Sequence, residues 1–179
     1  MGLITDKYSQ QIGVILQRYK DKQSAILPVM HLAQQVYGYM SPEAEQEVAQ
    51  ILDLDPTPVL SLAGFYSLYY EEPVGQYVLE ICHDLACALR GADEFLAMVC
   101  AKLGIEPEGT TADGLFSVKA VMCIGACDRA PALQCNLKFH ENLDEAKFDA
   151  LLAEWRAEAA QGNGGPSVVD KAIAGYARD

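Results

Sequence analysis

The stretch YVLEICHDLAC at residues 77–87 decides how the rest of the chain is interpreted. Its first part is apolar at nearly every position and rich in aromatic and β-branched residues, which is typical of a largely buried strand. The strand ends at Cys82, and Cys87 follows after four intervening residues. A buried strand that ends in a pair of cysteines predicts a domain built on a sheet, with chemistry at the end of that strand.

A second stretch repeats this pattern. Residues 115–122 also read as a strand, and they lead into Cys123 and Cys127, which have three residues between them. Loops that leave neighbouring strands lie close together, so the two pairs can converge although 35 residues separate them in sequence. Four converging thiolates hold either structural zinc or a [2Fe–2S] cluster. The wide loops favour the cluster, and the spacing alone leaves zinc open.

The remaining elements of this half are helices and a hairpin. Residues 91–103 carry apolar side chains on one helical face and end at Gly104, a typical C-terminal cap. Residues 132–135 and 137–140 predict a hairpin, and a capping box at residues 142–145 predicts a last amphipathic helix through Trp155. The order of elements predicts a mixed sheet of about four strands with helices packed against it.

The N-terminal part has helical periodicity and no strand pattern. Four short helices are expected, with starts at Thr5, near residue 26, at Ser41–Pro42 and at Thr57–Pro58. The aromatic run at residues 64–70 is expected to be the packed end of the fourth helix, with a contact to another subunit as the alternative. The whole chain is therefore expected to be an α+β protein with a helical domain at residues 1–72, a sheet domain at residues 73–160 and a flexible linker and tail at residues 161–179.

The charge of the chain excludes several classes of partner. There are 25 acidic and 13 basic residues, which give a formal net charge of −12 and a pI near 4.6. This charge repels phosphate backbones and anionic lipid surfaces, so we expect neither nucleic-acid binding nor binding to membranes through a basic patch. No apolar stretch is long enough for a membrane span, and no leader pattern is present, so a reducing cytosol is expected.

A reducing compartment argues against a disulfide framework for the 6 cysteines. Cys100 and Cys135 fall within a predicted helix and a predicted strand, where a cysteine behaves as a small buried hydrophobe. Arg90 and Arg129 lie close to the paired cysteines in sequence; they are candidates for offsetting negative charge there, and a surface position without such a role is the plainer expectation for each. No nucleotide-binding fingerprint or catalytic nucleophile motif is present, so we expect no NAD or flavin site and no catalytic residue on this chain.

The sequence resembles a known family at these same residues. CHDLACALRG at residues 82–91 and CIGACDRAP at residues 123–131 are similar to the thioredoxin-like [2Fe–2S] ferredoxin family, whose best-known member is the 24 kDa, or E-type, subunit of respiratory complex I, NADH:quinone oxidoreductase. LPVMHLAQ, YGYMSPE and AGFYSLY, at residues 27–34, 37–43 and 63–69, resemble the helical domain of that subunit. The resemblance covers residues 8–155.

The resemblance implies a thioredoxin-like domain that carries one [2Fe–2S] cluster on Cys82, Cys87, Cys123 and Cys127. It implies a subunit that docks on the flavoprotein subunit that binds NADH and FMN, beside other subunits of the peripheral arm, and whose cluster accepts one electron from the flavin. It implies a bacterial cytoplasmic location on the inner face of the membrane, without direct membrane insertion. A tail beyond the usual end of the domain is expected to contact another subunit.

Other readings stay open beside this one. Similar subunits occur in NAD-dependent formate dehydrogenases and NAD-coupled hydrogenases, with the same kind of flavoprotein partner. A stand-alone ferredoxin and a zinc-stabilised adaptor are further alternatives. The sequence of this chain does not distinguish complex I, a formate dehydrogenase and a hydrogenase as the parent complex.

Overall fold

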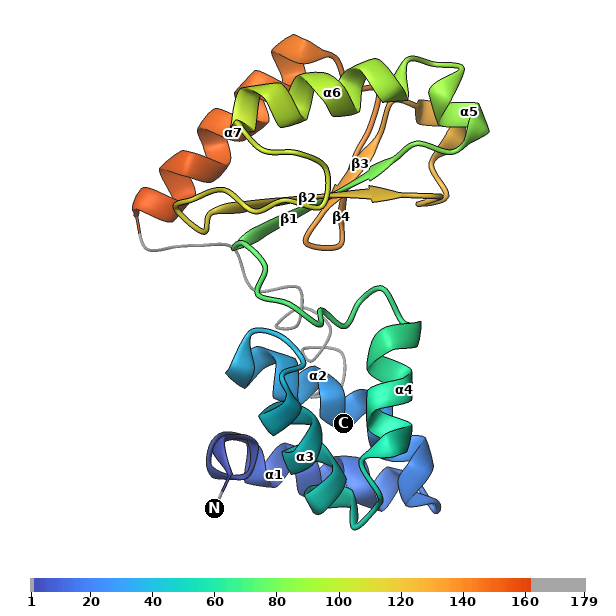
Figure 1. The fold of residues 1–179 in the computed structure, drawn as a ribbon, viewed down its shortest axis with the longest axis vertical. Coiled ribbons are helices and arrows are strands. Elements are labelled where there is room, and N and C mark those ends of the chain that lie inside the picture. The colour runs from blue at the N-terminus through green and yellow to red at the C-terminus, as the bar shows by residue number, and fades with distance from the viewer. Residues whose placement is uncertain (1, 162–179) are drawn as a thin grey trace. The chain divides into compact units, whose positions relative to one another are not determined.

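The computed structural model describes residues 2–161, and the expectations for the linker and tail lie almost wholly outside these residues. The described chain forms two compact units that meet in sequence between Pro73 and Val74. The first unit is helical, and the second contains a sheet with helices (Figure 1).

Four α-helices and one 3-10 helix make up the described part of the first unit. They are α1 (Leu3–Arg18), η1 (Lys22–Ala25), α2 (Ile26–Tyr37), α3 (Pro42–Leu52) and α4 (Thr57–Phe65). The local signals explain two of the boundaries. The Ser41 side chain accepts a hydrogen bond from the Ala44 amide at the start of α3, and Gly38 ends α2 with a φ of 82°.

The predicted start of the first helix is wrong. The helix begins at Leu3, with Gly2 as its N-cap, and the cap has no side-chain hydrogen bond of its own. The carboxylate of Glu47, on α3, binds the amides of Ile4 and Thr5 instead. Thr5 is therefore not the cap, because a residue far away in the sequence satisfies the free amides that a local side chain was expected to bind.

The aromatic run at residues 64–70 only partly packs as expected. Tyr69 and Tyr70 are buried, whereas Phe65 is 78% exposed and Tyr66 is 41% exposed. The end of the run that contains Tyr69 and Tyr70 is held by Gln34, whose side chain donates to the carbonyl of Leu68 and accepts from the amide of Tyr70. Helix α4 ends at Phe65, so the run leaves the helix and lies along α2 through these bonds.

The second unit contains a mixed four-stranded sheet in the order β2-β1-β3-β4. The strands are β1 (Tyr77–Cys82), β2 (Phe116–Val121), β3 (Leu133–Cys135) and β4 (Lys138–His140). Strands β1 and β2 are parallel, and the β1–β3 and β3–β4 pairs are antiparallel. The predicted strands and the hairpin are confirmed.

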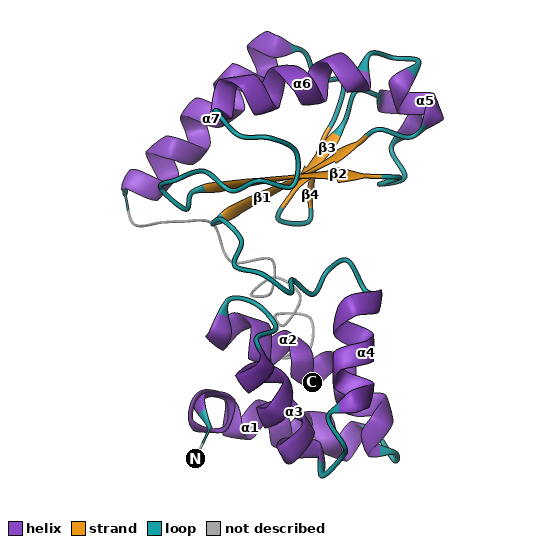
Figure 2. Ribbon diagram, viewed as in Figure 1, coloured by secondary structure: helices purple, strands orange, loops and turns teal. Residues whose placement is uncertain are grey.

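The helices of this unit are α5 (Leu85–Ala88), α6 (Ala92–Leu103) and α7 (Glu145–Ala160), with the 3-10 helix η2 (Cys127–Arg129). Helices α6 and α7 lie on the same side of the sheet (Figure 2). The core between them and the sheet includes Phe116, Phe148 and Trp155. The N-cap of α7 is Asp144, whose carboxylate accepts from the Lys147 amide, and not Asn142 as the capping-box pattern suggested.

Candidate metal centre

The four paired cysteines lie at one end of the parallel strand pair. Cys82 is the last residue of β1, and its register partner on β2 is Val121. Cys87 is in the short helix α5, Cys123 follows the end of β2, and Cys127 opens the 3-10 helix η2. Because Cys82 and Val121 are level in the sheet, the loops that carry both cysteine pairs leave it at the same height.

The thiols form two pairs in space as well as in sequence. Among the thiols, Cys87 interacts most strongly with Cys82, and Cys127 interacts most strongly with Cys123. Cys87 also interacts electrostatically with both thiols of the second pair. All four residues that the sequence singled out therefore lie at the same end of the parallel strand pair, within range of electrostatic interaction with one another.

The two pairs differ in exposure. Cys82 and Cys87 are each 1% exposed, whereas Cys123 and Cys127 are exposed. Burial, together with the neighbouring thiols, raises the pKa of the Cys87 thiol to about 12. The pKa of Cys127 is also raised, chiefly by the adjacent Cys123. Metal binding must displace these protons, and binding will therefore depend on pH.

Backbone groups hold the thiols in place. The Cys82 thiol donates to the carbonyl of Met122 at 3.3 Å, and the Gly125 amide donates to Cys123 Sγ at 3.4 Å. Gly125 has a φ of 79°, a conformation that residues with side chains rarely adopt. On the other loop, Asp84 caps α5 through the Leu85 amide, which fixes the helix that carries Cys87.

Arg129 is an exposed residue, as its plainer interpretation from the sequence has it, with 57% of its side chain exposed. Its guanidinium lies 2.7 Å from Glu141 and 3.5 Å from Asp128. Its positive charge is therefore already matched by two carboxylates of the protein. No sequence signal pointed to Glu141, because its link to Arg129 depends on how the chain folds.

The donor set fits a two-iron cluster. A [2Fe–2S] cluster takes four thiolates, two on each iron, and the structure offers two thiol pairs that interact with each other electrostatically. The Gly125 amide supplies a hydrogen bond to sulfur of the kind that tunes such centres. Within residues 2–161, no group of three or more His, Cys, Asp or Glu side chains forms a preformed site for a metal ion, so the fit rests on the chemistry and pairing of the four cysteines.

Three exposed apolar residues flank the paired cysteines in sequence. They are Leu85, Leu89 and Met122, and we refer to them as the apolar rim. Leu85 is 72% exposed, Leu89 is 79% exposed and Met122 is 66% exposed. Leu85 and Leu89 lie two residues to either side of Cys87, and Met122 precedes Cys123. The sequence pattern did not indicate this rim, because α5 is too short to produce a periodic signal.

The other candidate residues lie elsewhere. Cys100 and Cys135 are buried in the core of the second unit, as expected. His140 packs edge-on against Trp155, and the His31 ring contacts that of Tyr69 in the helical unit, so neither joins the paired cysteines. Burial lowers the pKa of both histidines.

None of the helices formed by the described residues has the length and apolar character needed to cross a bilayer.

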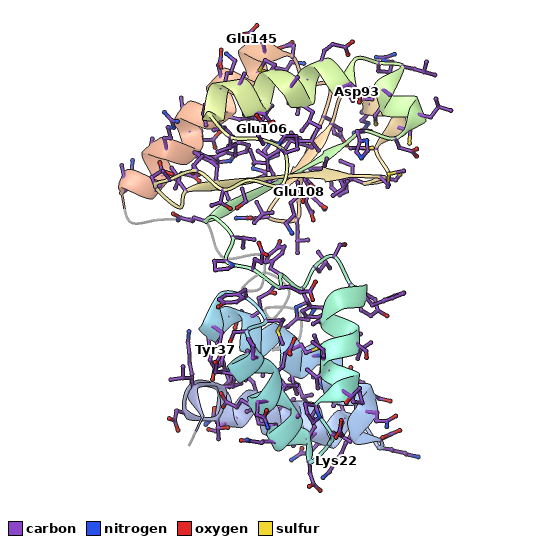
Figure 3. The ribbon with its side chains drawn as sticks, viewed as in Figure 1. Lys22, Tyr37, Asp93, Glu106, Glu108 and Glu145 are labelled. Carbon is purple, nitrogen blue, oxygen red and sulfur yellow. The ribbon has the colours of Figure 1, made fainter. Side chains whose placement is uncertain are left out.

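The acidic residues Asp93 and Glu145 lie in the first turns of α6 and α7 (Figure 3), where their negative charges interact favourably with the positive end of the helix dipole.

Comparison with known proteins matches residues 12–156 to the family described as thioredoxin-like [2Fe–2S] ferredoxin. The E 2 subunit of the NADH-quinone oxidoreductase of Rhizobium meliloti is 40% identical over 148 residues, which cover 83% of this chain and 88% of the relative. NADH-quinone oxidoreductase subunit 2 of Thermus thermophilus is 41% identical over 137 residues, which cover 76% of each chain.

A solved structure is also similar. The crystal structure of an NAD⁺-reducing [NiFe]-hydrogenase in the air-oxidized state matches with a TM-score of 0.65 and 26% sequence identity over 74% of this chain. The match spans only 23% of the hydrogenase chain.

Proposed function

The chain belongs to the thioredoxin-like [2Fe–2S] ferredoxin family, and on this premise we propose that it is the iron–sulfur subunit of an NADH:quinone oxidoreductase. The observation that carries the proposal is the meeting of two thiol pairs at the ends of β1 and β2, within a chain at least 40% identical to two subunits of that enzyme. When bound, a [2Fe–2S] cluster supplies a one-electron acceptor and donor.

Cys82, Cys87, Cys123 and Cys127 are the ligands in this proposal. The buried pair is shielded from water, and the exposed pair lies at the surface through which a redox partner would approach. In the cluster-free chain the Cys82 thiol donates to the Met122 carbonyl, a bond that is lost when the thiol gives up its proton, whereas the Gly125 amide continues to donate to Cys123 Sγ when that sulfur is a thiolate. Cys100 and Cys135 have no part in binding, because they lie in the core.

The proposed partner is the flavoprotein subunit that binds NADH and FMN, together with other subunits of the peripheral arm. The apolar rim of Leu85, Leu89 and Met122 supports docking near the cysteines, because these three exposed apolar side chains flank the proposed ligands in sequence and apolar patches are typical of protein interfaces. On this proposal the subunit sits at the cytoplasmic face of the bacterial inner membrane and reaches the membrane only through its complex.

The hydrogenase likeness supports a second candidate. The matched hydrogenase chain is more than four times as long as the matched segment, so in that protein a module of this fold is one part of a larger polypeptide. An NAD-coupled hydrogenase or formate dehydrogenase could therefore use a chain like this one. The higher identity to the quinone-linked subunits favours the first candidate.

Anaerobic purification of the full chain tests the cluster. We expect two irons and two sulfides per chain, a coloured protein, and a rhombic signal in electron paramagnetic resonance after reduction. Stoichiometric zinc in a colourless protein would establish the adaptor reading instead.

Co-purification from the native host tests the parent complex. Membrane subunits in the purified complex indicate a quinone-linked enzyme, and a molybdenum or nickel–iron subunit indicates one of the alternatives. Isolation without any flavoprotein would support a stand-alone carrier.

A further inference from the structure

One ligand-bearing turn is fastened to a distant part of the chain. The 3-10 helix η2 runs from Cys127 to Arg129, and both the backbone and the side chain of Arg129 are bound to the connection between β4 and α7. The Arg129 carbonyl accepts a hydrogen bond from the Asn142 amide at 2.7 Å. The Arg129 guanidinium donates to the Glu141 carboxylate, also at 2.7 Å.

The next residues continue this attachment. The Leu143 amide donates to the carbonyl of Pro131 at 2.9 Å, so Arg129 and Pro131 are held by consecutive residues of the same connection. Asn142 has a φ of 50°, so the connection turns sharply where it meets η2. By contrast, the sulfur of Cys123 is supported by the Gly125 amide of its own largely exposed loop.

We propose that Arg129 and Glu141 form a clamp that positions Cys127, and that Arg129 is a positioning residue and not a counter-charge for the cluster. The inference rests on the proposed function, since it concerns the residues that hold the proposed cluster. The 3-10 helix starts at Cys127, so a displacement of Arg129 moves the sulfur of Cys127 relative to the other three thiols.

The charges around Arg129 separate the two roles. A counter-charge needs a positive group whose field is free to act on the thiolates. Arg129 instead faces Glu141 at 2.7 Å and Asp128 at 3.5 Å, so this group of three side chains carries a net negative charge. Glu141 is the more sheltered partner, with 29% of its side chain exposed compared with 57% for Arg129.

The test uses the full chain with its cluster and a set of matched variants. Arg129→Gln and Glu141→Gln each break the ion pair, and the double variant completes a cycle. Arg90→Gln is the control, because it removes one positive charge at a similar distance in sequence from Cys87, and no ion pair of Arg90 occurs among residues 2–161. The reversed pair, Arg129→Glu with Glu141→Arg, restores the attraction if the single variants fold poorly. Arg129→Lys keeps the charge but loses the planar guanidinium.

Three readouts are measured: the rate of cluster loss to a chelator, the midpoint potential and the paramagnetic resonance signal of the reduced protein. A clamp predicts about two- to fivefold faster loss in both single variants, the size expected for one exposed ion pair, with no further acceleration in the double variant. It also predicts partial rescue by Arg129→Lys, recovery in the reversed pair, and a broadened resonance signal in both single variants.

A counter-charge predicts a different pattern. Removing Arg129 would lower the midpoint potential and removing Glu141 would raise it, while neither change would speed cluster loss or broaden the resonance signal; opposite shifts in potential without those two effects would overturn the clamp. Loss rates equal to that of Arg90→Gln would overturn it as well, while leaving the cluster itself intact. A wild-type protein without iron and sulfide would instead overturn the proposed function.

Discussion

The Glu47 carboxylate lies 2.9 Å from the backbone nitrogen of Ile4, across 43 residues of sequence. The same oxygen accepts from the Thr5 amide at 3.0 Å, and the other oxygen accepts from the Tyr37 hydroxyl at 2.8 Å. One buried side chain on α3 thus caps α1 and binds α2. Three of the four α-helices described in the first unit are joined by it.

Replacement of Glu47 by alanine should destabilise the helical unit by about 1–3 kcal/mol, because it removes a helix cap and leaves the amide of Ile4 buried without a partner. The free energy of unfolding from urea titration of the full chain, followed by circular dichroism, measures the loss. Gln50→Ala on the exposed face of the same helix is the control. An effect no larger than that of the control would show that solvent replaces the carboxylate.

The same carboxylate should make the helical unit sensitive to acid. Burial acts to raise the pKa of Glu47, but hydrogen bonds from Thr5, Tyr37 and Ile4 outweigh it and leave the pKa below its usual value of 4.5. A carboxylate with a lowered pKa in the folded state stabilises the fold above its unfolded pKa, and this stability disappears as the pH falls further. Thermal melts below about pH 4.5 should show a steeper decline for the wild type than for Glu47→Gln. Parallel curves would contradict this account.

Serine at any of the four paired cysteines should remove or strongly reduce the cluster. Iron and sulfide analysis after anaerobic purification measures this effect. Cys100→Ala and Cys135→Ala are the controls, since both side chains lie in the core and should keep a full complement of iron at some cost in stability. Loss of iron in either control, with the fold intact by circular dichroism, would show that the ligand set is wrong.

The cluster-free protein should lose stability in alkali. Burial raises the pKa of Cys87 from its usual value of 9.0 to about 12, so the unfolded chain releases this proton at lower pH than the folded chain does. Stability should therefore fall between about pH 9 and pH 12. Thermal melts of the apo-protein across this range, compared with those of apo Cys87→Ala, isolate the contribution. An equal decline in both proteins would assign the effect to other groups.

The apolar rim should matter for assembly and not for cluster binding. Leu85→Gln with Leu89→Gln should weaken co-purification with the flavoprotein subunit at least tenfold and leave the iron content unchanged, because both side chains are mostly exposed in the isolated chain. Leu60→Gln, at an exposed position of α4 in the other unit, is the matched control. If the control weakens assembly as much as the double variant, the contact extends over the helical unit.

Most of the fold was predictable because its signals are local. Gly38 and Gly104 end their helices where predicted, and Ser41 caps α3 as its sequence position suggests. Strand β1 could be predicted without an alternating pattern of apolar and polar residues. Every residue of that strand is buried, and the nearly continuous apolar run is itself typical of a buried strand. These are cases in which a few neighbouring residues determine the geometry.

The errors arise where a distant residue decides the local structure. Thr5 has a typical capping side chain, but Glu47 binds the free amides instead. Asn142 opens a capping-box pattern, but its amide donates to the carbonyl of Arg129, and Asp144 is the N-cap of α7. The cysteine pairs could be identified from spacing and resemblance, whereas the Arg129–Glu141 contact could not, since no local pattern encodes it.

The level pairing of Cys82 with Val121 also determines when the centre can be completed during biosynthesis. Cys127 follows Cys82 by 45 residues, and a ribosome that adds about 5–20 residues per second needs about two to nine seconds to make that segment. Until then Cys82 and Cys87 are free thiols without the second strand that brings their partners to them. On the proposed ligand set, insertion of a complete cluster must therefore wait for the parallel strands to pair, and the first two thiols must stay reduced in the meantime.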